Sequence, residues 1–130
     1  MRERPLSPHL SVYRMTRYTL FSSIFNRFTG VALSVGLIVL IYWLMAVAGG
    51  SRSYQRAYDV LSSGILKLFY AAMLVAFCYH LVAGIRHLIW DTDTGMERAQ
   101  SKTSAAIVVT ISIVLVVLLG YWLFLSGGRA

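Results

Sequence analysis

The sequence contains 130 residues, of which 58% are hydrophobic and only 13% are charged. Roughly a quarter of the residues in a soluble globular domain are charged, so this composition excludes that class and indicates a membrane protein. The net charge of +7 comes from basic residues scattered along the segments that flank apolar runs. This distribution is typical of membrane topology and indicates no nucleic-acid partner.

Three runs without Asp, Glu, Lys or Arg are long enough to cross about 30 Å of hydrocarbon at about 1.5 Å per residue. They cover residues 28–51, 68–85 and 103–128. We therefore predict an all-α membrane protein with one transmembrane domain, 1–130. A cytoplasmic or interfacial segment at 1–21 precedes spans at about 23–49, 60–90 and 103–126, and a short loop at 52–58 joins the first two spans.

The basic residues predict the orientation of these spans. With three spans, the amino terminus and the second loop lie on the same side of the membrane. That side carries eight of the twelve basic residues, against four on the other side. Because basic residues are enriched on the cytoplasmic side, we expect the amino terminus in the cytoplasm of a bacterial cell, with the chain in the inner membrane.

The first span opens with Ser23 and Arg27, which are four residues apart and so share one face of a helix. At the boundary between headgroups and hydrocarbon, such a pair could hold a carbonyl or carboxylate group of a ligand. The alternative is purely structural: Arg27 extends to lipid phosphates and Ser23 caps the helix.

The second span carries a stripe formed by His80, Gly84 and His87, because positions four and seven apart lie on one helix face. A histidine at this depth can be a haem axial ligand, a proton relay or a hydrogen-bond partner between helices. Gly84 favours haem, because it leaves bare backbone where a porphyrin could lie. Arg27, Arg86 and His87 could then receive the haem propionates.

One helix cannot supply both axial ligands of a six-coordinate haem, and His80 and His87 lie on the same face. The first and third spans contain no histidine. A second ligand would therefore come from another chain, which predicts that this protein is part of a heteromeric helical bundle or of a symmetric dimer. The third span has no charged side chain and is assigned no chemistry.

Three segments in the same order resemble a known family: RPLSPHLSVY at 4–13, SIFNRFTG at 23–30, and HxxxGIRHLxWD at 80–91. Over the whole chain, the sequence resembles the cytochrome b556 subunits of succinate dehydrogenase, respiratory complex II. One departure is Asn26, where some members have a histidine beside the arginine.

The resemblance implies a membrane anchor for a flavoprotein subunit that oxidises succinate and an iron-sulfur subunit that relays electrons. With a second small membrane-anchor subunit, the chain would enclose haem b and form the ubiquinone site. His80 would be the axial ligand of the haem iron. Ser23 would donate a hydrogen bond to a quinone carbonyl, and Arg27 would support the quinone or a propionate. Arg86 and His87 would lie near the propionates or the soluble subunits.

Three other functions remain open at this point. The chain could be a haem-free structural anchor in which His80 only bonds to a neighbouring helix. It could be an anchor of fumarate reductase, which runs the same reaction in reverse. A small transporter subunit, with the histidine as a proton relay, is the third.

Overall fold

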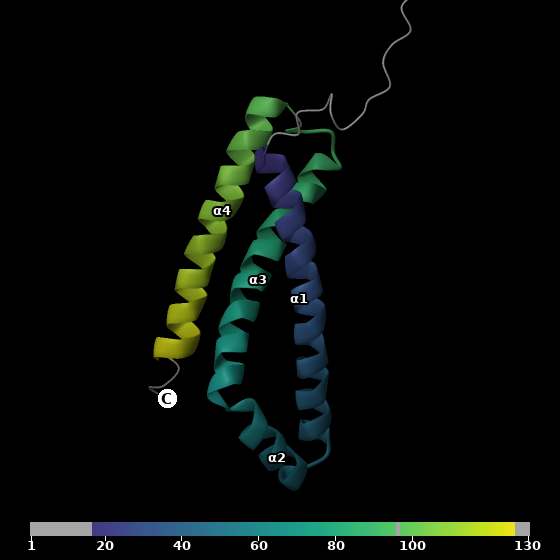
Figure 1. Cartoon of the computed structure of the whole chain (residues 1–130), viewed down its shortest axis with the longest axis vertical. Coiled ribbons are helices and arrows are strands. Elements are labelled where there is room, and N and C mark those ends of the chain that lie inside the picture. Colours follow the sequence, from purple (N-terminus) through teal and green to yellow (C-terminus); the bar gives the residue numbers. More distant parts are fainter. Residues whose placement is uncertain (1–16, 96, 127–130) are drawn as a thin grey trace, which may run out of the picture.

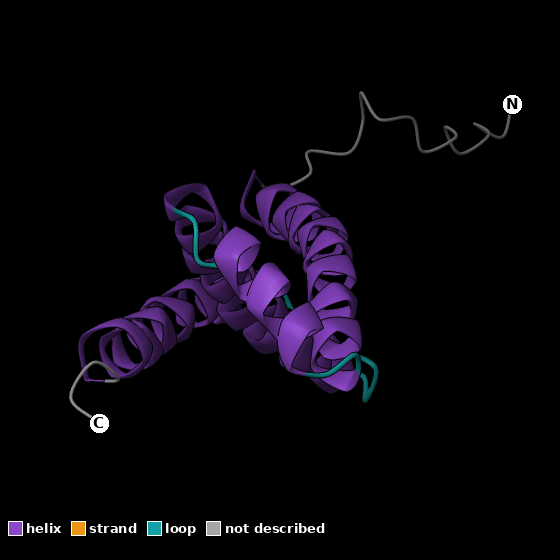
Figure 2. Ribbon diagram, turned by 90° about the horizontal axis from the view of Figure 1, so that it is seen from below, coloured by secondary structure: helices purple, strands orange, loops and turns teal. Residues whose placement is uncertain are grey.

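In the computed structural model, residues 17–95 and 97–126 are described, and they form helices without any strand (Figures 1 and 2). The helices are α1 Arg17–Ala48, α2 Ser51–Leu61, α3 Gly64–Trp90 and α4 Arg98–Gly120, followed by the π-helical turn η1 Tyr121–Ser126. Most of the predicted interfacial segment, including the motif at 4–13, lies outside the described residues.

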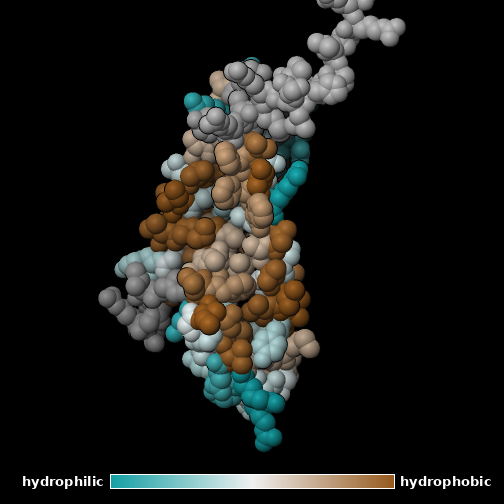
Figure 3. Space-filling view, viewed as in Figure 1, coloured by the Kyte–Doolittle hydropathy of each residue, from teal (hydrophilic) through white to brown (hydrophobic). Residues whose placement is uncertain are grey.

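Three helical segments are long and apolar enough to span a membrane: Leu20–Ala48 in α1, Gly64–Trp90, which is α3, and Ala99–Leu123, which runs from α4 into η1. The 27 residues of α3 extend over about 40 Å, which exceeds the thickness of the hydrocarbon core. Apolar side chains cover the middle of the molecule, whereas the end that carries α2 is hydrophilic (Figure 3). The prediction of an all-α membrane protein with three spanning helices is confirmed.

The prediction of a short loop at 52–58 is wrong, because α2 occupies this stretch. Gly50 separates α2 from α1 with a φ of +83°, a left-handed conformation that glycine adopts without strain. On α2, Tyr54, Tyr58 and Leu61 follow the spacing of one helix face, whereas Arg52 lies on the opposite face. Such a short amphipathic helix is suited to the membrane surface, where it joins the ends of α1 and α3 (Figure 1).

Helix α3 is central, since it packs against both α1 and α4 (Figure 1). Arg86 of α3 is only 6% exposed and ties the three helices together. Its Nη1 donates to Ser22 Oγ of α1 at 2.9 Å, and its Nε donates to Ser104 Oγ of α4 at 2.9 Å. Its Nη2 donates to the Ser101 carbonyl at 3.0 Å, and the guanidinium lies 4.0 Å from the centre of the Trp90 ring. We call this cluster the Arg86 node.

Tyr79 strengthens the same junction between α1 and α3. Its hydroxyl donates to the Ser22 carbonyl at 3.2 Å, with the Ser22 hydroxyl at 3.4 Å, and its ring packs edge-on against Phe25. The first turns of α1 therefore lie at the level of the last turns of α3. This agrees with the predicted topology, in which the start of the first span and the end of the second share one side of the membrane.

We expect Ser22→Ala to destabilise the bundle by about 1–3 kcal/mol, because a buried donor of Arg86 and the Tyr79 hydroxyl would lose an acceptor. Thermal unfolding of the detergent-purified complex, followed by circular dichroism, measures this loss. Ser34→Ala is the matched control, because the exposed Ser34 hydroxyl bonds only to the Gly30 carbonyl of its own helix. Equal unfolding temperatures for the two variants would contradict the role of the node.

Candidate functional site

His80, on α3, faces α1 and makes its polar contacts there. Its Nδ1 lies 3.1 Å from the Asn26 carbonyl oxygen and 3.2 Å from Thr29 Oγ1. The Thr29 hydroxyl in turn donates to carbonyl oxygens of its own helix, at 2.9 Å to Phe25 and 3.0 Å to Asn26. The imidazole is thus held by the backbone and a hydroxyl of the neighbouring helix.

This contact fixes which nitrogen of His80 carries the proton. A carbonyl oxygen can only accept a hydrogen bond, so Nδ1 must be the donor to Asn26. In the neutral imidazole, Nε2 is then the nitrogen with a free lone pair. Histidines that bind metals commonly donate their other ring N–H to a carbonyl in this way. His80 therefore has the tautomer of a metal ligand.

Two glycines shape the surroundings of His80. At Gly30 of α1, an added Cβ would lie 3.1 Å from His80 Cε1, so the ring packs directly on the bare backbone of α1. At Gly84 of α3, an added Cβ would meet no described atom within 4 Å. The helix that carries His80 thus has open space one turn further along, as the sequence predicts.

The side chain of Asn26 lacks a hydrogen bond in this part of the chain. Within the described ranges, its Oδ1 is the one buried side-chain nitrogen or oxygen that lacks a hydrogen bond. His80 Nε2 likewise makes no hydrogen bond within the described residues, since both polar contacts of the ring are made by Nδ1. A buried acceptor normally finds a donor in water or another molecule. Asn26 Oδ1 and His80 Nε2 are therefore two acceptors for which the described helices supply no donor.

Arg86 and His87, the other polar residues predicted on this helix, behave differently from His80. Arg86 is buried in the node described above. His87 is exposed and stacks edge-on against the Trp90 ring, with 5.4 Å between the ring centres. His80 therefore bonds to α1, Arg86 links the three helices, and His87 is exposed near the end of α3.

Ser23 and Arg27 lie on α1 near this end of the bundle. Ser23 is half-buried, next to the Ser22 that bonds to Arg86, whereas Arg27 is exposed. Arg27 borders a shallow apolar hollow of about 300 Å³, formed with Ile24, Phe28 and Val31 of the same helix. The pair is brought close to the end of α3, but no closed pocket forms around it in the described residues.

Sequence reasoning missed the partners of these residues. Ser22, Asn26 and Thr29 carry the contacts between α1 and α3, and Ser101 and Ser104 hold Arg86 from α4. A seven-residue spacing gives one available signal, because Ser22 and Thr29 share a helix face. The role of the Asn26 carbonyl cannot be read from the sequence, because every residue has a backbone carbonyl group.

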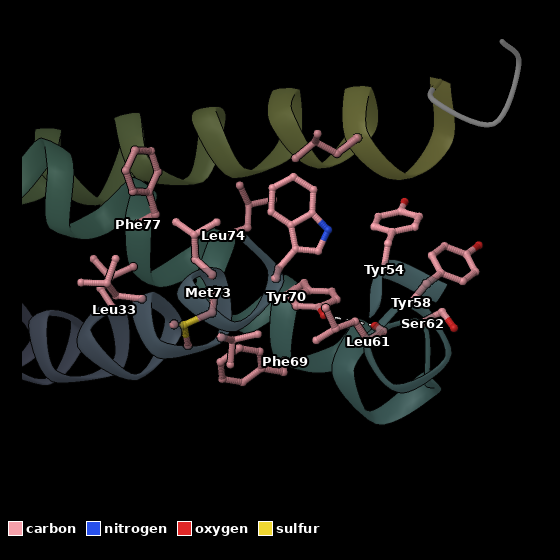
Figure 4. Close-up of a pocket in the computed structure, with 16 residues that line it drawn as sticks. Leu33, Tyr54, Tyr58, Leu61, Ser62, Phe69, Tyr70, Met73, Leu74 and Phe77 are labelled. Atoms are coloured by element: carbon pink, nitrogen blue, oxygen red, sulfur yellow. Dashed lines mark hydrogen bonds between the residues drawn. The ribbon is translucent and has the colours of Figure 1, made fainter. Parts of the chain in front are cut away.

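A larger apolar pocket of about 900 Å³ lies between α1, α2 and α3 (Figure 4). It begins at Leu33 and Phe77, and Tyr54, Tyr58 and Ser62 lie at its other end (Figure 4). No charged side chain lines it among the described residues. It can accept an apolar chain or a neighbouring helix, but it offers no groups for proton transfer other than hydroxyls.

Comparison with known proteins agrees with this geometry. Residues 1–119 match the family described as succinate dehydrogenase/fumarate reductase transmembrane subunit. The chain is 37% identical over 115 residues to the succinate dehydrogenase cytochrome b556 subunit of Paracoccus denitrificans, which covers 88% of each chain. It is 37% identical over 117 residues to the subunit of that name from Rickettsia prowazekii (strain Madrid E), covering 90% of each chain.

A mitochondrial relative is more distant. The succinate dehydrogenase cytochrome b560 subunit of Sus scrofa is 33% identical over 112 residues, which cover 85% of this chain and 66% of that protein. The family match and these identities extend over both the His80 region and the Ser23 region. The chain belongs to the family of succinate dehydrogenase/fumarate reductase transmembrane subunits.

Proposed function

We propose that this chain is the membrane-anchor cytochrome b subunit of a succinate:ubiquinone oxidoreductase. The family match and the names of the relatives support this role, together with three spanning helices. Its partners are a flavoprotein subunit, an iron-sulfur subunit and a second small membrane-anchor subunit. The excess of basic residues on one side supports a position in a bacterial inner membrane with the amino terminus in the cytoplasm.

The single observation that carries the haem assignment is the hydrogen bond from His80 Nδ1 to the Asn26 carbonyl. It leaves Nε2 unprotonated, and Gly84 leaves open space on the same helix. These features fit haem b, with His80 as the axial ligand of the iron. When bound, the haem supplies a one-electron carrier. A second ligand to the iron would come from the partner membrane subunit, because the first and third spans of this chain contain no histidine.

Arg27 and His87 are the groups best suited to the haem propionates, because both side chains are exposed whereas Arg86 is buried. Arg86 uses each of its three nitrogens within the chain, so its main role toward the haem is to position α1 against α3. Its Nη2 also lies 3.4 Å from Ser101 Oγ, whereas Nη1 retains a further N–H group. A propionate at this end could still take a charge-assisted bond from Arg86.

Ser23 and Arg27 form the contribution of this chain to the ubiquinone site. Reduction of ubiquinone takes up two electrons and two protons, so the site needs access to water and to the iron-sulfur subunit. The pair lies on the first turns of the long α1, near the end of the span. The Ser23 hydroxyl donates to a quinone carbonyl, and the Arg27 guanidinium stabilises negative charge on the reduced ring.

The alternative is a haem-free anchor. The same bond between His80 and Asn26 favours it, because a histidine that links two helices needs no metal to be stabilising. The two functions differ in one respect: only haem ligation uses Nε2.

We expect His80→Gln to abolish or strongly alter the b-type absorption of the purified complex, because glutamine offers no ligand nitrogen in place of Nε2. A reduced-minus-oxidised difference spectrum measures this. His87→Gln is the comparison on the same helix and should retain the absorption, because a contact to a propionate supplies no ligand to the iron. An unaltered spectrum in His80→Gln, or no b-type absorption in the unmodified complex, would refute the haem assignment.

We expect Arg27→Ala to lower the rate of quinone reduction by about tenfold or more, because a hydrogen bond to a charged group contributes about 1.5–3 kcal/mol. Ser23→Ala, which removes a neutral donor, should have a smaller effect of a few-fold. Both variants should oxidise succinate normally with a soluble artificial acceptor.

The comparison of the two acceptors distinguishes a quinone role from failed assembly. Ser34→Ala serves as the control on α1 and should leave both rates unchanged. Equal losses with ubiquinone and with the soluble acceptor would contradict a quinone role for Ser23 and Arg27.

A further inference from the structure

The surface of α1 beneath His80 consists of the Asn26 carbonyl, the Thr29 hydroxyl and the bare backbone of Gly30. We call it the α1 shelf. We propose that Thr29 and Gly30 are positioning residues that set how strongly His80 donates electrons to a bound haem iron, and hence the reduction potential of that haem. This inference rests on the proposed function, in which His80 is the axial ligand.

The direction of each hydrogen bond on the shelf follows from its chemistry. Thr29 has one O–H group, and carbonyl oxygens of Phe25 and Asn26 lie 2.9 and 3.0 Å from Oγ1. These oxygens can only accept, so they take the hydroxyl proton. The lone pairs of Oγ1 are then left for the third neighbour, His80 Nδ1 at 3.2 Å. The Nδ1–H group is therefore shared between two acceptors.

Two acceptors on Nδ1–H affect the opposite nitrogen. An acceptor draws the proton away from the ring and makes the imidazole a more basic ligand. A more basic ligand stabilises oxidised iron relative to reduced iron, which lowers the reduction potential. The Thr29 hydroxyl also takes part of the accepting capacity of the Asn26 carbonyl, so its removal changes both acceptors. Removing the hydroxyl deletes one of the two acceptors of Nδ1–H. The other acceptor, the Asn26 carbonyl, stays in place and changes only in strength, so the deletion is the larger of the two changes.

Gly30 determines how close the ring can come to these acceptors. A Cβ at this position would lie 3.1 Å from His80 Cε1 and 3.7 Å from Nδ1. Carbon atoms pack best at about 3.5–4.0 Å, so a methyl group here would push the ring away from α1. The glycine therefore allows the ring to lie within hydrogen-bond distance of the carbonyl.

The experiment is a redox titration of the haem in the intact purified complex. Thr29→Val keeps the shape of the side chain and removes the hydroxyl, so the haem potential should shift upward. Thr29→Ser restores a hydroxyl and should return the potential toward that of the unmodified complex. Thr103→Val is the matched control, because the exposed Thr103 hydroxyl bonds only to the Ala99 carbonyl of α4, and the potential should not change.

A second variant tests the shelf without changing the hydroxyl. Gly30→Ala should displace the ring and alter the electron paramagnetic resonance spectrum of the oxidised haem. Gly120→Ala is its control, because a Cβ there would make an ordinary contact of 3.8 Å with Leu74.

The outcomes separate this inference from the proposed function. An unchanged potential in Thr29→Val, or a shift of the same size in Thr103→Val, would overturn the role of the shelf. If His80→Gln abolished the absorption while Thr29→Val and Gly30→Ala had no effect, only the inference would fail. Retention of the haem spectrum in His80→Gln would instead refute the proposed function. If Thr29→Val lost the haem and Thr29→Ser kept it, the hydroxyl would be required for haem binding itself, which also supports a positioning role for Thr29.

Discussion

The hydrogen bond from His80 Nδ1 to the Asn26 carbonyl is the interaction on which the site depends. It joins α3 to α1 inside an apolar bundle, where an unpaired N–H group would cost several kcal/mol. Because the acceptor is a backbone atom, it remains in place whatever side chain stands at residue 26. The same bond that links the helices also assigns the proton to Nδ1, so Nε2 keeps its lone pair.

The Arg86 node keeps that bond in register. Arg86 lies six residues beyond His80 on α3 and grips Ser22, which lies four residues before Asn26 on α1. The two contacts fix both the rotation and the axial position of one helix against the other. Toward α2 the helices instead enclose the large apolar pocket, where packing contacts such as Met73 against Gly36 replace hydrogen bonds. Side-chain hydrogen bonds therefore hold the polar end of the bundle, and apolar packing holds the end near α2.

The sequence predicts the spans well because an apolar run of about 20 residues has few alternatives to a transmembrane helix. It also singles out His80, because an imidazole at membrane depth is uncommon, and the role of His80 as a haem ligand stays a prediction. It does not reveal the Asn26 carbonyl or the choice of Ser22 over Ser23 as the partner of Arg86, since these depend on helix rotation. The helix at Ser51–Leu61 was predictable from the spacing of Tyr54, Tyr58 and Leu61, but its charged residues gave it the composition of a loop.

The polar groups of this chain divide into those that are satisfied internally and those that are not. Arg86, Tyr79 and Nδ1 of His80 all find partners within the described helices, and they hold the bundle together. Nε2 of His80 and Oδ1 of Asn26 do not, although they lie on the same two helices. A buried acceptor normally has a donor, and for these two atoms the described helices supply none. This division is what we expect of a chain that folds its own helices and, under the proposed function, completes its site together with a second membrane subunit.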